Sequence, residues 1–162
     1  KPLLFGGGHQ RGLRSGTLNV PGIVGLGEAC RLRSEEMNVD EPVTFARRNR
    51  LQHLLESHIQ GLVVNGDCQN RLASNLHISI PDIPNSVIIA RVRSQLAIST
   101  GAACSSGVET PSHVLTAMKL PVKVVNGALR LSLGKFTTDE EVEQAAQILS
   151  LAVAETRERM AK

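Results

Sequence analysis

The sequence predicts an α/β (α+β) fold, a two-layer sandwich in which helices cover one side of a small sheet. Residues 76–80 and 128–133 alternate between apolar and polar side chains, which is typical of strands with one buried face. Residues 23–32, 42–60 and 138–162 carry apolar side chains at helical spacing, which predicts amphipathic helices. Because the two patterns alternate along the chain, we expect about four short strands joined by turns or single helices.

Length and composition are those of one globular domain. The chain has 162 residues, of which 41% are apolar, enough for a sizeable core. The net charge is only +3, the arginines are scattered and 2% of residues are aromatic, so a nucleic-acid interface is not expected. No run of about 18 apolar residues occurs, so no membrane span is expected.

The cysteines and histidines predict neither a disulfide framework nor a metal site. Cys30, Cys68 and Cys104 are odd in number and widely spaced, and no Cys-x-x-Cys occurs. The five histidines fall at no recognised zinc spacing. This pattern favours a reducing compartment, the cytoplasm or an organelle stroma.

The first half of the chain predicts two helices separated by a joint. Residues 34–41 are polar and predict the joint, and the second helix begins near a proline that follows them. Arg47, Arg48 and Arg50 form a basic face on that helix. We expect this face to lie in solvent, with an acidic partner as the alternative.

The second half places short elements around a segment of small residues. Residues 95–98 predict a brief buried strand, and residues 111–118 predict a helix with a proline in its first turn. Thr138, followed three residues later by Glu141, predicts a capping box at the start of the last helix.

Cys104 lies between these elements, in the segment Ser-Thr-Gly-Ala-Ala-Cys-Ser-Ser-Gly at residues 99–107. A buried cysteine normally lies within a periodic apolar stretch, whereas this one is surrounded by small and polar residues. The setting favours a reactive thiol on a loop over a small core residue.

Two further positions carry candidate binding groups. The glycine-rich segment 6–17 is not a Walker loop, and its backbone N–H groups, the Thr17 hydroxyl and the Arg14 guanidinium suit a phosphate; a plain surface loop is the alternative. Arg130 lies on the polar side of the strand at 128–133, opposite three leucines. Its planar fork suits a carboxylate, and the alternative is a solvent-facing charge or a structural ion pair.

Three segments together resemble the cysteine desulfurases of the NifS/IscS type, members of the class V aminotransferase family. These are residues 99–115 around the cysteine, the glycine-rich segment 6–17 and the strand region 129–138. The resemblance implies the small C-terminal domain of a fold type I enzyme that uses pyridoxal 5'-phosphate. Residues 1–21 would be the tail of the large cofactor-binding domain, and residues 22–162 the small domain.

The resemblance also implies a role for each candidate residue. Arg130 would hold the α-carboxylate of L-cysteine, and Cys104 would attack the substrate sulfur, leaving L-alanine and a persulfide. Thr17 would reach across a homodimer interface to the cofactor phosphate, with Arg14 and Arg11 as weaker candidates. The sulfur would pass to an acceptor or iron-sulfur scaffold protein.

One departure from the family is the missing cofactor lysine. The family's Ser-x-His-Lys type motif does not occur in this sequence, and the chain starts abruptly without a methionine. We therefore expect part of a longer enzyme, unable to retain the cofactor alone and with apolar surface exposed over residues 1–30. A selenocysteine lyase or cystine lyase of the same fold, and a non-catalytic sulfur-carrier or partner-binding module, remain as alternatives.

Overall fold

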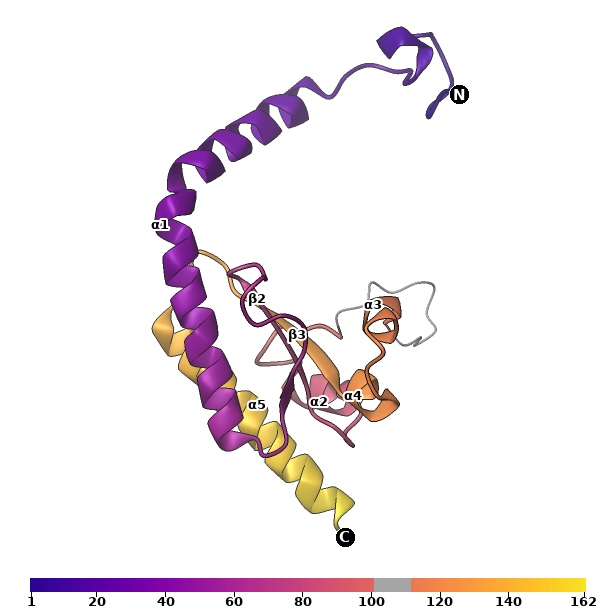
Figure 1. Cartoon of the computed structure of the whole chain (residues 1–162). Helices are drawn as coiled ribbons and strands as arrows, with labels where there is room; N and C mark the ends of the chain where they lie inside the picture. Colours follow the sequence, from indigo (N-terminus) through magenta and orange to yellow (C-terminus); the bar gives the residue numbers. More distant parts are fainter. Residues whose placement is uncertain (101–111) are drawn as a thin grey trace. The chain divides into compact units, whose positions relative to one another are not determined.

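The computed structural model describes residues 1–100 and 112–162. It divides into two compact units, Lys1–Asn38 and Val39–Lys162. Each unit is described by itself below, and Figure 1 gives the order of the elements along the chain.

The first unit contains little regular structure before helix α1 begins. Leu4 forms an isolated parallel bridge with Arg14, and a single 3-10 turn, η1, spans Gln10–Gly12. Apolar side chains of this unit are exposed, with Leu3 83% and Phe5 85% accessible. The expected apolar surface over the first 30 residues is therefore present.

Helix α1 runs without interruption over Val20–His58, so the predicted joint between two helices is wrong. The polar stretch there contains good helix formers, and Arg31 forms ion pairs with Glu28 and Glu35 along one side. Pro42 lies inside the helix and lacks the N–H that would bond to the carbonyl of Asn38.

The inward side of α1 within the second unit also differs from the prediction. Thr44, Arg48, Leu51 and Leu55 are buried, whereas Val43 is exposed. The expectation that Arg48 lies in solvent is wrong, because Arg48 lies on the same side of the helix as the buried residues Thr44 and Leu55.

The second unit is built on a three-stranded antiparallel sheet in the order β1-β2-β3. The strands are β1 (Val63–Val64), β2 (Asn75–Ser79) and β3 (Ala128–Ser132). The strand predicted at residues 95–98 is absent, because the N–H groups of residues 95 and 96 bond back to the Val92 carbonyl. That pattern closes a turn after helix α2 (Asn85–Val92).

Helices cover one face of this sheet, as the two-layer prediction requires (Figure 1). Side chains of α1, α2 and α5 (Asp139–Met160) join those of the strands in one core. The buried core residues that define it include Leu55, Leu76, Ile78, Ile88, Leu129, Leu131, Val142, Leu149 and Val153. The α/β sandwich expected from the sequence is the observed fold class.

A second, smaller cluster lies at one end of the opposite face. It comprises Leu115 of α3 (His113–Ala117), Val125 of α4 (Val122–Asn126) and Ala128 of β3. Because alternate residues of a strand face opposite sides, Ala128 shares this face with Arg130. Among the strand residues, Val63 of β1 shares this face with the polar residues His77 and Ser79.

The predicted capping box is present at the start of α5. The Thr138 hydroxyl accepts a hydrogen bond from the Glu141 N–H at 3.2 Å, and the Glu141 carboxylate accepts one from the Thr138 N–H at 2.8 Å. Two of the otherwise unbonded N–H groups of the helix end are thereby satisfied.

Candidate functional site

Arg130 lies on the open, polar face of β3. Its neighbours Leu129 and Leu131 point into the core and are buried, whereas Arg130 is exposed. The alternation predicted from the sequence therefore holds, and the guanidinium stands on a strand fixed from the other side by the core. A rigid element positions a binding group better than a loop does.

The start of β3 is fixed by a close approach between backbones. A Cβ atom added to Gly127 would lie 2.0 Å from the Ile80 carbonyl oxygen, so only glycine fits there. The Ile80 N–H bonds to the Gly127 carbonyl at 3.0 Å, and the Asn85 side chain donates to the Ala128 carbonyl at 3.0 Å. These contacts set the position of Arg130 three residues further on.

Ser99 pairs directly with Arg130 through the backbone. The Arg130 N–H donates to the Ser99 carbonyl at 2.7 Å, and the Ser99 N–H donates to the Arg130 carbonyl at 3.2 Å. Cys104, the predicted nucleophile, lies outside the described residues. The bridge nevertheless brings the start of the cysteine segment, residue 99, to the predicted carboxylate ligand.

His77 of β2 is the cross-strand neighbour of Arg130. Residues directly opposite in an antiparallel pair point to the same face, so the two side chains share the polar face of the sheet. Burial lowers the pKa of His77 below its usual 6.5, and the positive charge of Arg130 lowers it further. His77 is therefore neutral at pH 7 and adds no second positive charge beside Arg130.

A buried amide orients the His77 ring. Asn65 donates from Nδ2 to His77 Nδ1 at 3.0 Å and to the Ser79 hydroxyl at 2.7 Å. With Nδ1 accepting, the neutral ring carries its proton on Nε2. Sequence reasoning placed His77 away from the core but missed Asn65, whose only sequence signal was the Asn-Gly-Asp turn that follows β1.

Thr17 lies in the first unit, in a loop held by Arg14. The Arg14 guanidinium donates to the carbonyls of Gly16 and Thr17 at 2.7 and 3.1 Å, and Gly16 adopts a φ of +97°. The Thr17 side chain is exposed at this turn. A hydroxyl beside a glycine turn is a donor set that suits a phosphate, whereas Arg14 is used within the loop.

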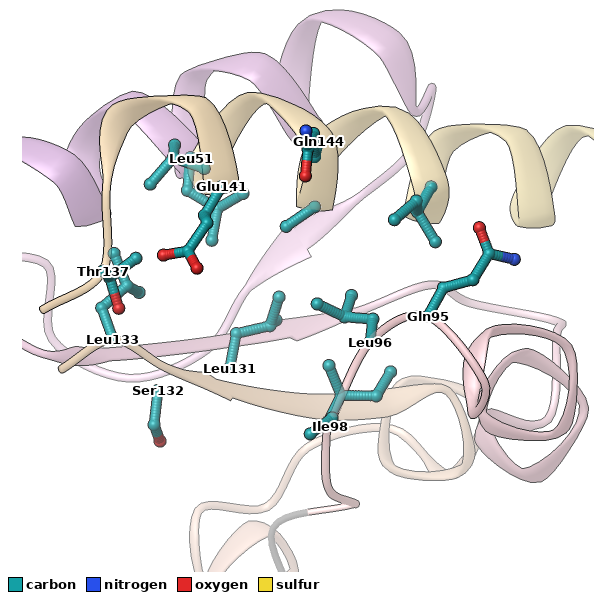
Figure 2. A pocket seen from close by; sticks show the side chains of 14 residues that line it. Leu51, Gln95, Leu96, Ile98, Leu131, Ser132, Leu133, Thr137, Glu141 and Gln144 are labelled. Carbon is teal, nitrogen blue, oxygen red and sulfur yellow. The ribbon is translucent and has the colours of Figure 1, made fainter.

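A cavity of about 330 Å³ lies between α5, β3 and residues 95–98 (Figure 2). Apolar side chains such as Leu96, Ile98 and Leu131 line it, with Gln95 and Glu141 also contributing. Neither Thr17 nor Arg130 is among its lining residues. Most of the lining side chains belong to the core-facing side of β3, to α5 and to residues 95–98.

The described residues form neither a metal site nor a membrane span. In the part of the chain that the structure describes, no group of three or more histidine, cysteine or acidic side chains could hold a metal ion. Within residues 1–100 and 112–162, no helix has the length and apolar character needed to cross a membrane. All five lysines of the chain lie in the part that the structure describes. Two of them form ion pairs, Lys123 with Asp82 and Lys135 with Asp40.

The family profile described as Aminotransferase class-V matches residues 5–145. The chain belongs to this family of aminotransferase-like proteins.

The most informative relatives are all desulfurases by name. The chain is 40% identical over 153 residues to a cysteine desulfurase IscS of Anaeromyxobacter sp. (strain K), and 41% identical over 156 residues to that of Pasteurella multocida (strain Pm70). These matches cover 94% and 96% of this chain. The chain spans 38% of the length of either relative.

Solved structures agree with this assignment. A NifS-like protein superposes with a TM-score of 0.82 at 31% identity, over 95% of this chain and 39% of the other. DndA from Streptomyces lividans superposes with a TM-score of 0.61 at 37% identity, over 82% and 36%. The fold is therefore that of part of a fold type I enzyme.

Proposed function

We propose that this chain is the C-terminal part of a pyridoxal-phosphate-dependent cysteine desulfurase, with Cys104 as nucleophile and Arg130 as the substrate-carboxylate ligand. The observation that carries the proposal is the backbone bridge between Ser99 and Arg130. It joins the strand bearing the carboxylate ligand to the segment bearing the thiol. Four residues lie between Ser99 and Cys104, so an extended chain spans at most about 18 Å from one to the other.

The geometry of Arg130 suits an amino-acid carboxylate. The guanidinium stands exposed on a strand whose backbone is fixed on both sides, by β2 and by Ser99. Its planar guanidinium can donate two parallel hydrogen bonds to a carboxylate. Because His77 is neutral, Arg130 carries the positive charge of this pair of neighbours. Arg130 would thus orient the substrate.

The residues fit pyridoxal phosphate only in part. The exposed Thr17 hydroxyl at the Gly16 turn suits its phosphate, but no lysine lies in a Ser-x-His-Lys type motif that would attach it covalently. Bound by the complete enzyme, the cofactor would act as an electron sink at the substrate carbon. This chain alone would supply the Thr17 contact to the cofactor phosphate but no lysine that binds the cofactor covalently.

The reaction assigned to the chain's own residues balances without an external oxidant. The Cys104 thiolate attacks the sulfur of L-cysteine, an S–S bond forms and the substrate C–S bond breaks. The electron pair left on carbon takes up a proton, which gives L-alanine. The persulfide on Cys104 then carries the sulfur to an acceptor or iron-sulfur scaffold protein, in the cytoplasm or an organelle stroma.

The proposal is tested on the full-length protein. L-Cysteine should yield one L-alanine per sulfur transferred, and Cys104→Ala should abolish both products. Arg130→Lys should lower kcat/KM for L-cysteine about 10- to 100-fold, because a forked, charge-assisted contact is lost. Turnover of selenocysteine without turnover of cysteine, or undiminished alanine formation by the Cys104 variant, would contradict the proposal.

A further inference from the structure

Two arginines away from the polar face of Arg130 hold buried guanidinium nitrogens without partners. Arg48 of α1 is 0% exposed, and its Nε, Nη1 and Nη2 have no hydrogen-bond partner among residues 1–100 and 112–162. In the same residues, Nε and Nη1 of Arg71 are also buried and unpartnered. Arg71 lies in the loop between β1 and β2 and is half-buried.

A hydrogen bond to Gln52 links Arg71 to the helix that carries Arg48. Arg71 donates from Nη2 to the Gln52 side chain at 2.7 Å. Gln52 lies four residues after Arg48 in α1, so its side chain is the neighbour of Arg48 on the same side of the helix. Burial lowers the pKa of Arg48, the charge of Arg71 lowers it further, and a negative charge on Cys68 would raise it.

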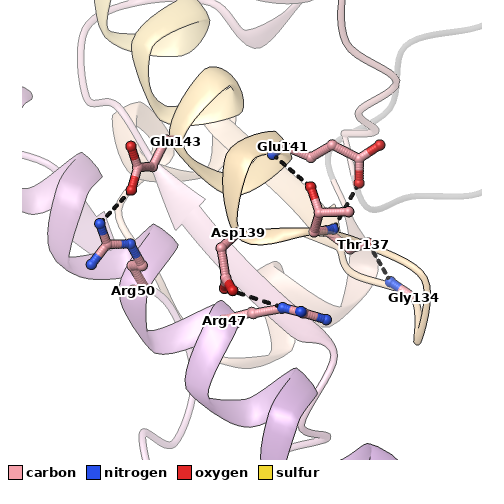
Figure 3. Close-up of polar contacts among 8 residues, drawn as sticks. Arg47, Arg50, Gly134, Thr137, Asp139, Glu141 and Glu143 are labelled. Carbon is pink, nitrogen blue, oxygen red and sulfur yellow. Dashed lines mark hydrogen bonds and ion pairs between the residues drawn. The ribbon is translucent and has the colours of Figure 1, made fainter.

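The two arginines closest to Arg48 in the sequence, Arg47 and Arg50, have acidic partners (Figure 3). Arg47 pairs with Asp139 at 3.2 Å, and Arg50 pairs with Glu143. The contact of Arg48 is instead the ring of Phe45, whose centroid lies 4.7 Å from the guanidinium carbon. The aromatic face stabilises a cation but accepts none of its hydrogen bonds in the plane of the guanidinium.

The carboxylate of Asp67, in the same loop as Arg71, already accepts hydrogen bonds from neighbouring loop residues. Asp67 accepts hydrogen bonds from the N–H groups of Gln69 and Asn70 and from the Asn70 side chain. Taking a charged group out of water without a partner is costly, and a second like charge beside it adds to the cost. An anion from outside these residues would satisfy both arginines at once.

We propose that Arg48 and Arg71 form a binding site for a small oxyanion, a phosphate, sulfate or carboxylate group. Planar guanidinium forks hold such groups through paired hydrogen bonds. Arg71 is half-buried and Cys68 is exposed, so the Arg71 side of the site borders solvent. The site is independent of the catalytic proposal, since neither arginine belongs to the polar face of Arg130.

The test compares thermal unfolding of the full-length protein in phosphate, sulfate, acetate and chloride at equal ionic strength. An oxyanion bound only by the folded state raises Tm as its concentration rises, whereas chloride at the same ionic strength does not. The acetate and phosphate series distinguish a carboxylate from a phosphate or sulfate ligand. Because phosphate and sulfate also stabilise folded proteins through exclusion from their surface, a rise in Tm supports the site only where Arg71→Gln removes it.

Variants assign the effect to these residues. Arg71→Gln should lose most of the oxyanion-dependent rise in Tm. Arg48→Met should lose it too, and should unfold at a higher temperature than the unaltered protein in chloride, because an unpaired buried charge is removed. Arg50→Gln is the matched control on the same helix and should keep the full response.

Three outcomes overturn the proposal. The first is an identical Tm in oxyanion and chloride at equal ionic strength. The second is an equal loss of response in Arg50→Gln and Arg71→Gln, which would show general charge screening. The third is an unchanged response in Arg71→Gln, which would show that the oxyanion acts elsewhere on the protein or through exclusion from its surface.

Discussion

His77 links the pH dependence of folding to the face that carries Arg130. Its folded-state pKa is lowered by burial and by Arg130, so between that pKa and 6.5 the unfolded chain binds more protons than the folded one. Stability from this residue is therefore fully present well above pH 6.5 and is lost as pH falls below 6.5 and through the lowered folded-state pKa. Urea denaturation of the unaltered chain and His77→Gln between pH 5 and 8 measures the effect.

The variant should show a smaller fall in the free energy of unfolding over that pH window. His53→Gln, which changes an exposed histidine of α1, serves as the control. If the free energy of unfolding depended on pH equally in His77→Gln and in the unaltered chain, another group would be responsible for the loss of stability at low pH.

Residue positions were predicted well where one strand's alternation decides them. The leucines around Arg130 assigned it to the open face, and the same pattern placed His77 opposite the core. Arg48 was misassigned because three nearby arginines in a helix indicate a solvated face. The buried side of α1 in fact includes Thr44 and Arg48, and Arg71 of the β1–β2 loop bonds to Gln52 one turn further along.

At the scale of the element, the capping box of α5 should contribute measurably to stability. Thr138→Ala removes the hydroxyl that accepts from the Glu141 N–H, and should lower the free energy of unfolding by about 1 kcal/mol. Chemical denaturation measures the change. Thr138→Ser keeps the hydroxyl and should stay within a few tenths of the original value, and equal losses in both variants would contradict the role of the cap.

Among the described glycines of the second unit, Gly127 should be the least replaceable. An alanine Cβ would meet the Ile80 carbonyl oxygen, so Gly127→Ala must displace either β3 or the turn after β2, at a cost of about 1–3 kcal/mol or more. Gly134→Ala is the control, because no atom lies within 4 Å of the added Cβ. If both variants had the same stability, the close approach would not be a constraint in solution.

Elements with their own local signals were predicted, and elements defined by their neighbours were not. The capping residues and periodicity identified α5, and alternation identified β2 and β3. Residues 34–41 were predicted as a joint because they are polar, but their glutamates also have high helix propensity. The ion pair between Arg31 and Glu35 further stabilises the helix there. Residues 95–98 have strand-like composition but close a turn on Val92, which only the hydrogen bonds of the folded chain decide.

At the scale of the whole molecule, the first unit should make the isolated chain associate. Its exposed apolar side chains include Leu3, Phe5, Val24 and Leu26, whereas residues 39–162 contain the main core. Sedimentation should show self-association of the 162-residue chain and less of a fragment spanning residues 39–162. Equal association of the two would place the responsible surface in the second unit.

The architecture was predictable, and the neighbourhood of the site was only partly so. Helical and alternating patterns were sufficient for a sheet with one helical layer. These patterns do not determine the strand register that pairs His77 with Arg130, or the bridge that pairs Ser99 with Arg130. Both pairings depend on contacts between segments that are far apart in the sequence. The position of Cys104 relative to Arg130 rests on the bridge and chain length alone.

The dependence of the core on α5 has a consequence for synthesis on the ribosome. Leu55 of α1 and Leu149 of α5 belong to the same core, and translation of the stretch between them takes about 5–20 s. Until α5 emerges, the apolar face of the sheet has no complete cover, and the nascent chain presents it to chaperones or to its neighbours on the polysome. Slow codons before residue 139 would therefore extend the period in which this protein is most prone to aggregate.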